Sequence, residues 1–101
     1  METQQVDDYF VTSPSVDIVA SQLESLRAQF LEHIQQGHTN LVIDLSNVGI
    51  IDSKGLALFA VCNKTVKDQS GKLTVVTNNA DFKKLFRVTR LDQHFEVRES
   101  L

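Results

Sequence analysis

The distribution of apolar and polar residues along the chain predicts four strands. Three short runs rich in β-branched or aromatic residues are typical of strands, and they cover residues 8–12, 41–46 and 72–77. Residues 94–99 alternate apolar and polar side chains, as an edge strand does. The run at 41–46 is continuously apolar apart from Asp44, which indicates a strand buried on both faces with that acid in its middle.

Three helices are predicted between these strands. The first covers residues 17–36 and the second 54–68. A shorter third helix covers 78–90, with Asn78 or Asn79 as its N-cap. The apolar residues that recur at helical spacing in the first helix are Val19, Leu23, Leu26, Phe30 and Ile34.

The alternation of strands and helices predicts a single α/β domain over residues 1–101. We expect a mixed, mostly parallel sheet of four to five strands with amphipathic helices packed on it. The first 19 residues allow one clear strand and at most a second very short one. The second helix follows the buried strand, so its start lies at the carboxyl end of the sheet, where α/β folds usually place their sites.

Composition narrows the classes of function. A formal net charge of −3 argues against a nucleic-acid partner. No apolar run approaches the length of a membrane span and no signal peptide is evident, so we expect a cytoplasmic protein without direct membrane insertion. The only cysteine, Cys62, lies in an apolar helical run, which favours a buried thiol over a reactive one.

Residues 49–58, GIIDSKGLAL, depart from an ordinary core pattern because an acid, a hydroxyl, a base and a glycine interrupt it. One interpretation is structural: the Ser53 hydroxyl caps the helix, and Gly55 allows a close approach to a neighbouring segment. The other is functional: free N–H groups and the positive end of the helix dipole would hold a phosphate attached to Ser53. The residues alone leave both interpretations open.

Spacing disfavours an enzyme at this position. Ser53 has no G-x-S-x-G surroundings, and the chain contains no phosphate-binding P-loop. The acidic pair Asp7-Asp8 precedes its strand and would lie at the wrong end of a parallel sheet for a phospho-acceptor receiver domain. We therefore expect no catalytic residue and no cofactor.

The three histidines lack metal-ligand spacing, so no metal site is expected. We interpret His33 as a solvated helix residue. His38 in a loop and His94 at the start of the last strand are interpreted as polar boundary residues.

From Leu41 onward the chain resembles a STAS domain, the fold of the anti-sigma factor antagonists. The resemblance rests on LVIDLSNVGIIDSKGLALF (41–59), GKLTVVT (71–77) and FKKLFRVTRLDQHFEV (82–97). It implies a binding module whose partner is an anti-sigma factor with serine kinase activity. Unphosphorylated protein would bind this kinase and release its sigma factor, phosphorylation would block binding, and a phosphatase would reset the switch.

Residue by residue, the resemblance makes Ser53 the phosphorylation site. Asp52, Gly55 and Leu56 match the family pattern Asp-Ser-x-Gly-Leu, whereas Lys54 stands where the family usually has a small residue. All five residues are predicted to form the partner-binding segment. The short segment before the first helix is a second departure, because the family usually has a hairpin there.

Two alternatives remain beside the phospho-switched antagonist. The chain could be a STAS interaction subunit that is not phosphorylated, within a lipid-transport ATPase or a sensory assembly, with Ser53 as the helix cap and Lys54 in the contact surface. An enzyme or a nucleotide binder is the weaker alternative, because the sequence supplies no phosphate loop and no pocket for base stacking.

Overall fold

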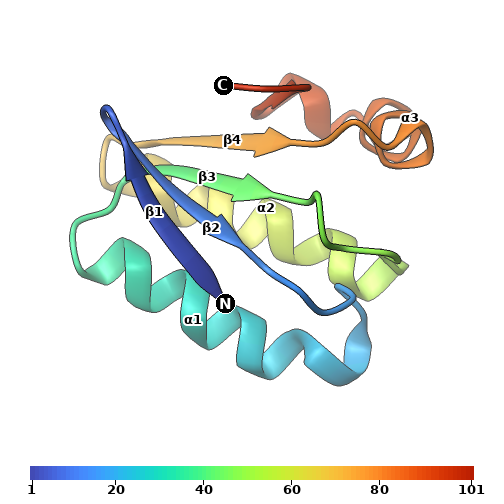
Figure 1. The fold of residues 1–101 in the computed structure, drawn as a ribbon, viewed down its shortest axis with the longest axis horizontal. Helices are drawn as coiled ribbons and strands as arrows, with labels where there is room; N and C mark the ends of the chain where they lie inside the picture. Colours follow the sequence, from blue (N-terminus) through green and yellow to red (C-terminus); the bar gives the residue numbers. More distant parts are fainter.

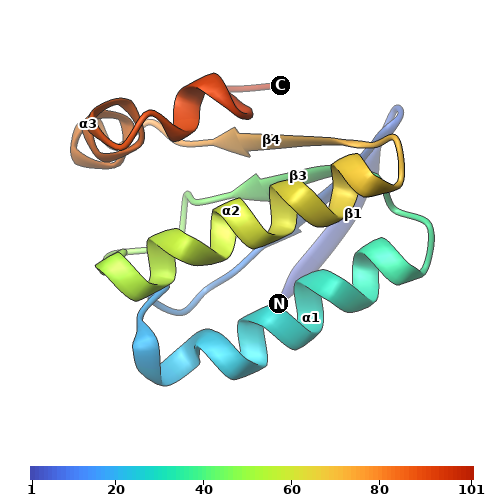
Figure 2. The ribbon, with the colours of Figure 1, turned by 180° about the vertical axis from the view of Figure 1, so that it is seen from behind.

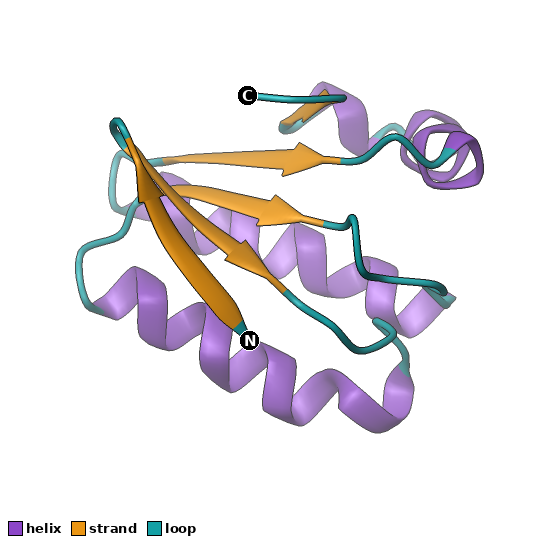
Figure 3. Ribbon diagram, in the orientation of Figure 1, coloured by secondary structure: helices purple, strands orange, loops and turns teal.

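A mixed five-stranded sheet forms the centre of the structure, a computed structural model that describes residues 1–101 (Figure 1, Figure 3). The strands lie side by side in chain order, with β1 antiparallel to β2 and all other neighbours parallel. They are β1 (Glu2–Val6), β2 (Tyr9–Ser13), β3 (Asn40–Asp44), β4 (Lys72–Val76) and β5 (Glu96–Arg98). The α/β architecture with a mostly parallel sheet is as predicted.

Two long helices cover one face of the sheet, α1 (Leu23–Gln35) and α2 (Ser53–Asp68) (Figure 2). The short helix α3 (Ala80–Val88) follows the carboxyl end of β4. Two 3₁₀ turns complete the chain, η1 before α1 and η2 before β5; they are Ala20–Gln22 and Leu91–Gln93.

The hydrophobic core lies between the sheet and these helices. Alternate residues of β3 and β4 point into it, as the two-residue repeat of a strand requires. From α1 the core receives Leu26, Phe30 and Ile34, all at most 1% exposed. The amphipathic spacing that predicted this helix is therefore confirmed for its central turns.

The N-terminal hairpin corrects the prediction of one clear strand. β1 has five residues and pairs with β2 along its whole length. Its sequence, ETQQV, is polar and its residues are mostly exposed, because an edge strand is held by backbone hydrogen bonds rather than by a buried face. Asp7, with φ of 52°, forms the tight turn. The hairpin typical of the family is thus present.

Several element boundaries also differ from the prediction. The first helix begins at Leu23 rather than near residue 17, because Val19 is extended and precedes η1. β3 ends at Asp44, which is therefore the last residue of its strand and not a mid-strand acid. The predicted N-cap of α3 is confirmed: of the two candidates it is Asn79, whose side-chain oxygen accepts hydrogen bonds from the N–H groups of Asp81 and Phe82 at 2.9 and 3.0 Å.

The single cysteine behaves as expected. Cys62 is fully buried in α2, and burial raises the pKa of its thiol to about 12. Because the thiolate is the reactive form, this thiol stays protonated and inert at neutral pH.

The interpretation of His33 as a solvated residue is wrong. It is half-buried, its ring centroid lies 5.0 Å from that of Phe10, and its Nε2 has no hydrogen-bond partner. His38 stacks on the same Phe10 with a centroid distance of 3.7 Å. Burial, followed by the charge of His38, lowers the pKa of His33 below its ordinary value.

This lowered pKa predicts a pH dependence of stability. The unfolded chain binds a proton at His33 near pH 6.5, whereas the folded protein resists that proton. The free energy of unfolding should therefore fall as the pH drops below about 6.5 toward the lower pKa of the folded state. Urea unfolding at about pH 7.5 and about pH 5.5 measures this difference.

The matched control for this prediction is His94, which is exposed. His33→Gln should reduce the loss of stability between the two pH values, whereas His94→Gln should leave it as in the parent chain. An unchanged pH dependence in His33→Gln would show that another group controls it.

Candidate functional site

Two loops that are distant in sequence are joined at the carboxyl end of the parallel strands. Ile18, in the loop between β2 and η1, forms an isolated parallel bridge with Ile51, in the loop before α2. The Ile18 N–H donates to the Ile50 carbonyl at 2.9 Å, and the Asp52 N–H donates to the Ile18 carbonyl at 3.2 Å. The start of α2 is thereby held against the segment that leads into α1.

Asp17 strengthens this junction and was not identified from the sequence. One of its carboxylate oxygens, Oδ1, accepts from the N–H groups of Gly49 and Ile50 at 3.1 and 3.0 Å. Two backbone donors on a loop are thus satisfied by a side chain 32 or 33 residues earlier. No local pattern around Asp17 signals such a distant partner.

Asp52, not Ser53, caps α2. Its Oδ1 accepts from the Gly55 N–H at 2.6 Å, and its Oδ2 accepts from the Ala20 N–H at 3.0 Å. These two donors, that of Gly55 foremost, lower the pKa of the Asp52 carboxyl, so that it stays ionised at neutral pH. Of the two interpretations that the sequence left open, the one in which the Ser53 hydroxyl caps the helix is therefore wrong, because the preceding acid occupies that position.

Ser53 and Lys54 are the exposed residues of the predicted binding segment. Ser53 is the first residue of α2, and its hydroxyl makes no hydrogen bond within the protein. It stands at the end of the helix where the dipole is positive and backbone donors are free. The fold makes no use of this hydroxyl, which leaves it available to react or to contact another molecule.

Gly55 and Leu56 are buried instead. A Cβ at Gly55 would lie 1.8 Å from the Ile18 carbonyl oxygen, so this position admits only glycine without a shift of the backbone. Leu56 is 9% exposed and belongs to the core. A direct role of these two residues in partner binding stays a prediction. Their burial is consistent with a role in positioning Ser53 and Lys54.

Asp44 forms a second polar group at the same end of the sheet. It accepts from the hydroxyls of Ser13 and Ser46 at 3.2 and 2.6 Å and from the Ser46 N–H at 3.0 Å. It thus ties the end of β2 to the end of β3. Asp7 and Asp8 lie at the β1–β2 turn, at the opposite end of the sheet, as the sequence predicted.

No three His, Cys, Asp or Glu side chains lie close enough together to hold a metal ion. None of the helices is both long enough and apolar enough to cross a membrane.

The profile of the STAS domain family matches residues 1–101. The chain belongs to the STAS domain family. A comparison with curated proteins finds no match. The resemblance found in the sequence is therefore confirmed at the level of the family, and the match also covers the N-terminal hairpin, where the sequence resemblance was weak.

Solved structures share the fold of this STAS domain at low sequence identity. TM1081 from Thermotoga maritima is 19% identical, with a TM-score of 0.91 over 99% of this chain and 86% of that one. An anti-sigma factor antagonist from Mycobacterium paratuberculosis is 25% identical, with a TM-score of 0.87 over 99% and 85% of the two chains. The Bacillus cell fate determinant SpoIIAA in its phosphorylated form is 17% identical, with a TM-score of 0.71 over 95% and 88%.

Proposed function

We propose that this STAS domain is an anti-sigma factor antagonist that is switched by phosphorylation of Ser53. Its partner would be an anti-sigma factor with serine kinase activity, and a phosphatase would restore the binding form. The observation that carries the proposal is the free, exposed hydroxyl of Ser53 at the start of α2, next to a cap formed by another residue. The similarity to the antagonist from Mycobacterium paratuberculosis and to phosphorylated SpoIIAA supports it.

The charge at the site explains how such a switch would act. A phosphate on Ser53 adds about −1.5 to −2 charges at neutral pH. It would stand beside the ionised carboxylate of Asp52, whose two oxygens already accept backbone hydrogen bonds. A partner that buries the neutral hydroxyl would have to bury this charge without a matched cation, at a cost of several kcal/mol.

Lys54 lies next to this hydroxyl and forms no ion pair closer than 4.0 Å. Its exposed ammonium can balance a phosphate on Ser53 only in part, because one cation faces a dianion and the Asp52 carboxylate together. In the unphosphorylated state the same ammonium would contact an acidic surface of the partner. Lys54 therefore contributes to the choice of partner in this proposal.

The test combines this chain with purified anti-sigma factors of the kinase type and ATP with Mg²⁺. Intact mass spectrometry should show one added phosphate, and Ser53→Ala should take up none. Ser21→Ala is the matched control, because Ser21 is an exposed serine near the same loop and should not alter the phosphate uptake. Phosphate uptake by Ser53→Ala would contradict the assigned site.

The affinity for the partner distinguishes the phosphorylation switch from the alternative of an interaction subunit that is not phosphorylated. Ser53→Asp should weaken binding of the partner at least about tenfold in the switch, because it places an unpaired charge in the contact. Ser53→Ala should bind with little change. If Ser53→Asp binds as tightly as the parent chain, the interface does not bury this residue, and the unphosphorylated interaction subunit is the better description.

A further inference from the structure

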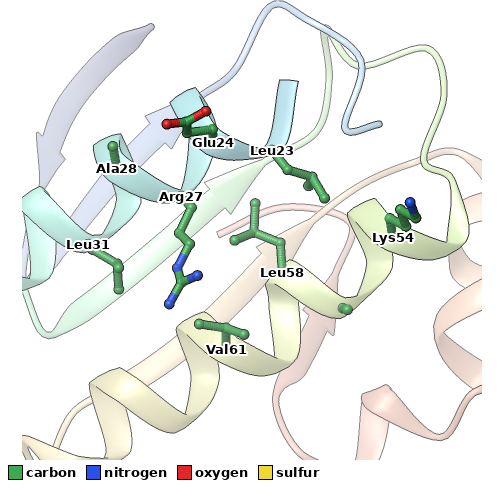
Figure 4. A pocket seen from close by; sticks show the side chains of 9 residues that line it. Leu23, Glu24, Arg27, Ala28, Leu31, Lys54, Leu58 and Val61 are labelled. Carbon is green, nitrogen blue, oxygen red and sulfur yellow. The ribbon is translucent and has the colours of Figure 1, made fainter. Parts of the chain in front are cut away.

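A groove runs between α1 and α2 on the side of these helices that faces away from the sheet (Figure 4). Its volume is about 550 Å³, and six of its nine lining residues are hydrophobic. Leu23 and Leu31 line it from α1, and Leu58 and Val61 line it from α2. Val61 is 38% exposed, so the groove presents aliphatic surface to solvent.

Arg27 places a positive charge over this apolar surface. Figure 4 shows its side chain extending from α1 toward Val61 on α2, whereas the Glu24 carboxylate lies farther from α2. Neither Arg27 nor Lys54, at the far end of the groove, has a carboxylate within 4.0 Å. Within the protein, the two cations of the groove are thus without an acidic partner, which a bound molecule can supply.

We propose that the groove between α1 and α2 binds an acidic amphipathic helix of a partner protein. The groove is open to solvent rather than enclosed, so it leaves one side of its occupant uncovered. A small molecule is usually enclosed over most of its surface, whereas a helix in a groove buries one apolar stripe and leaves its other face solvated. Aliphatic side chains of the partner would contact Leu58 and Val61, and its carboxylates would pair with the two cations.

The positions on α2 specify the pattern of the partner helix. Leu58 follows Lys54 by about one helical turn and Val61 by about two turns. A partner helix that lies along α2 would therefore carry two acidic residues about four to seven positions apart, on either side of an aliphatic stripe. Its carboxylates would meet Arg27 beside Val61 and Lys54 at the start of α2.

The Ser53 hydroxyl does not line this groove, and the proposal concerns the unphosphorylated chain. Lys54 lines the groove and also follows Ser53 in the chain, so the groove and the surface around Ser53 meet at this residue. The variants chosen for the test, Arg27→Glu and Val61→Lys, leave Ser53 and its neighbours unchanged. Failure of this proposal and failure of the phosphorylation switch are therefore distinguishable.

The test uses two helical peptides of 16 residues, the length of α2. Both carry a leucine stripe at helical spacing with two flanking charges, which are Glu in one peptide and Lys in the other. Titration of the ¹⁵N-labelled chain should show that the Glu peptide shifts amides of α1 and α2 along the groove. The Lys peptide should bind at least about tenfold more weakly.

Charge reversal on the protein gives the decisive comparison. Arg27→Glu should weaken binding of the Glu peptide at least about tenfold and strengthen binding of the Lys peptide. Val61→Lys should weaken binding of the Glu peptide, because it removes the aliphatic contact. Lys84→Glu makes the same change of charge at an exposed position of α3, outside the groove, and should change neither affinity. Thermal unfolding followed by circular dichroism shows that each variant is folded.

Four results would overturn the proposal. The first is equal affinity for the two peptides, and the second is amide shifts that lie outside α1 and α2. The third is amide shifts along the groove that depend on protein concentration when no peptide is present, which would show that a second copy of this chain binds there. The fourth is tighter binding of decanoate than of the Glu peptide, which would show a site for small anionic amphiphiles.

Discussion

Gly55→Ala is expected to lower the free energy of unfolding by about 2–3 kcal/mol. The added Cβ would lie 1.8 Å from the carbonyl oxygen and 2.6 Å from the carbonyl carbon of Ile18. That carbonyl accepts from the Asp52 N–H, so it cannot move without breaking the junction between the two loops. The better helix propensity of alanine offsets only about 1 kcal/mol of the cost.

Gly49, in the loop before α2, provides the control. A Cβ at Gly49 would meet only the Asp17 Oδ1, at 3.2 Å, and this atom belongs to a side chain that can shift. Gly49→Ala should therefore cost clearly less than Gly55→Ala, which should lower the melting temperature by roughly 10–20 °C. Urea and thermal unfolding measure both variants, and equal stabilities would show that the close approach of α2 to Ile18 is not maintained in solution.

The start of α2 could be predicted from the sequence, but its capping residue could not. The run Asp52-Ser53-Lys54-Gly55 predicted a helix start at the carboxyl edge of the sheet, and α2 begins at Ser53. Both Asp and Ser are favoured caps, so sequence alone could not tell which of the two neighbours occupies that position. The answer depends on Ala20, whose N–H holds the second carboxylate oxygen of Asp52 from 32 positions away.

In the fold, too, some elements could be predicted from the sequence and others could not. Buried elements such as β3 and β4 carry an apolar signal that is readable in the sequence, because the core selects their side chains. The edge strand β1 carries no such signal, since its residues face solvent and its stability comes from backbone pairing with β2. Asp17 was missed for the same reason: its function in the turn depends on contacts with Gly49 and Ile50, not on its own neighbours.

The capping of α2 by Asp52 bears directly on the proposed switch. If Ser53 were the cap, a phosphate there would remove a structural hydrogen bond and destabilise the start of α2. With Asp52 as the cap, the Ser53 hydroxyl can be modified while both carboxylate hydrogen bonds stay in place. The proposed phosphorylation therefore changes the charge of the surface without unfolding the helix that presents it.

The second large effect is expected for Phe86→Ala, at about 3–5 kcal/mol. Phe86 is a fully buried residue of α3, and it forms an aromatic cluster with Phe59 and Phe95. Its ring packs edge-on against Phe59 of α2 and against Phe95, with centroid distances of 5.2 and 5.7 Å. Removal of the ring leaves a cavity at the centre of this cluster, and it also removes both edge-to-face contacts.

The loss should be a large share of the total stability, since a chain of this length is stabilised by only about 5–15 kcal/mol. Phe86→Leu keeps most of the volume and should cost about 1.5 kcal/mol or less. Val88→Ala truncates a side chain of the same helix that is 63% exposed and should change stability by less than about 0.5 kcal/mol. Urea unfolding gives the three values. A small effect of Phe86→Ala would mean that α3 is not firmly packed on α2, and that α2 is held by the sheet and α1 without it.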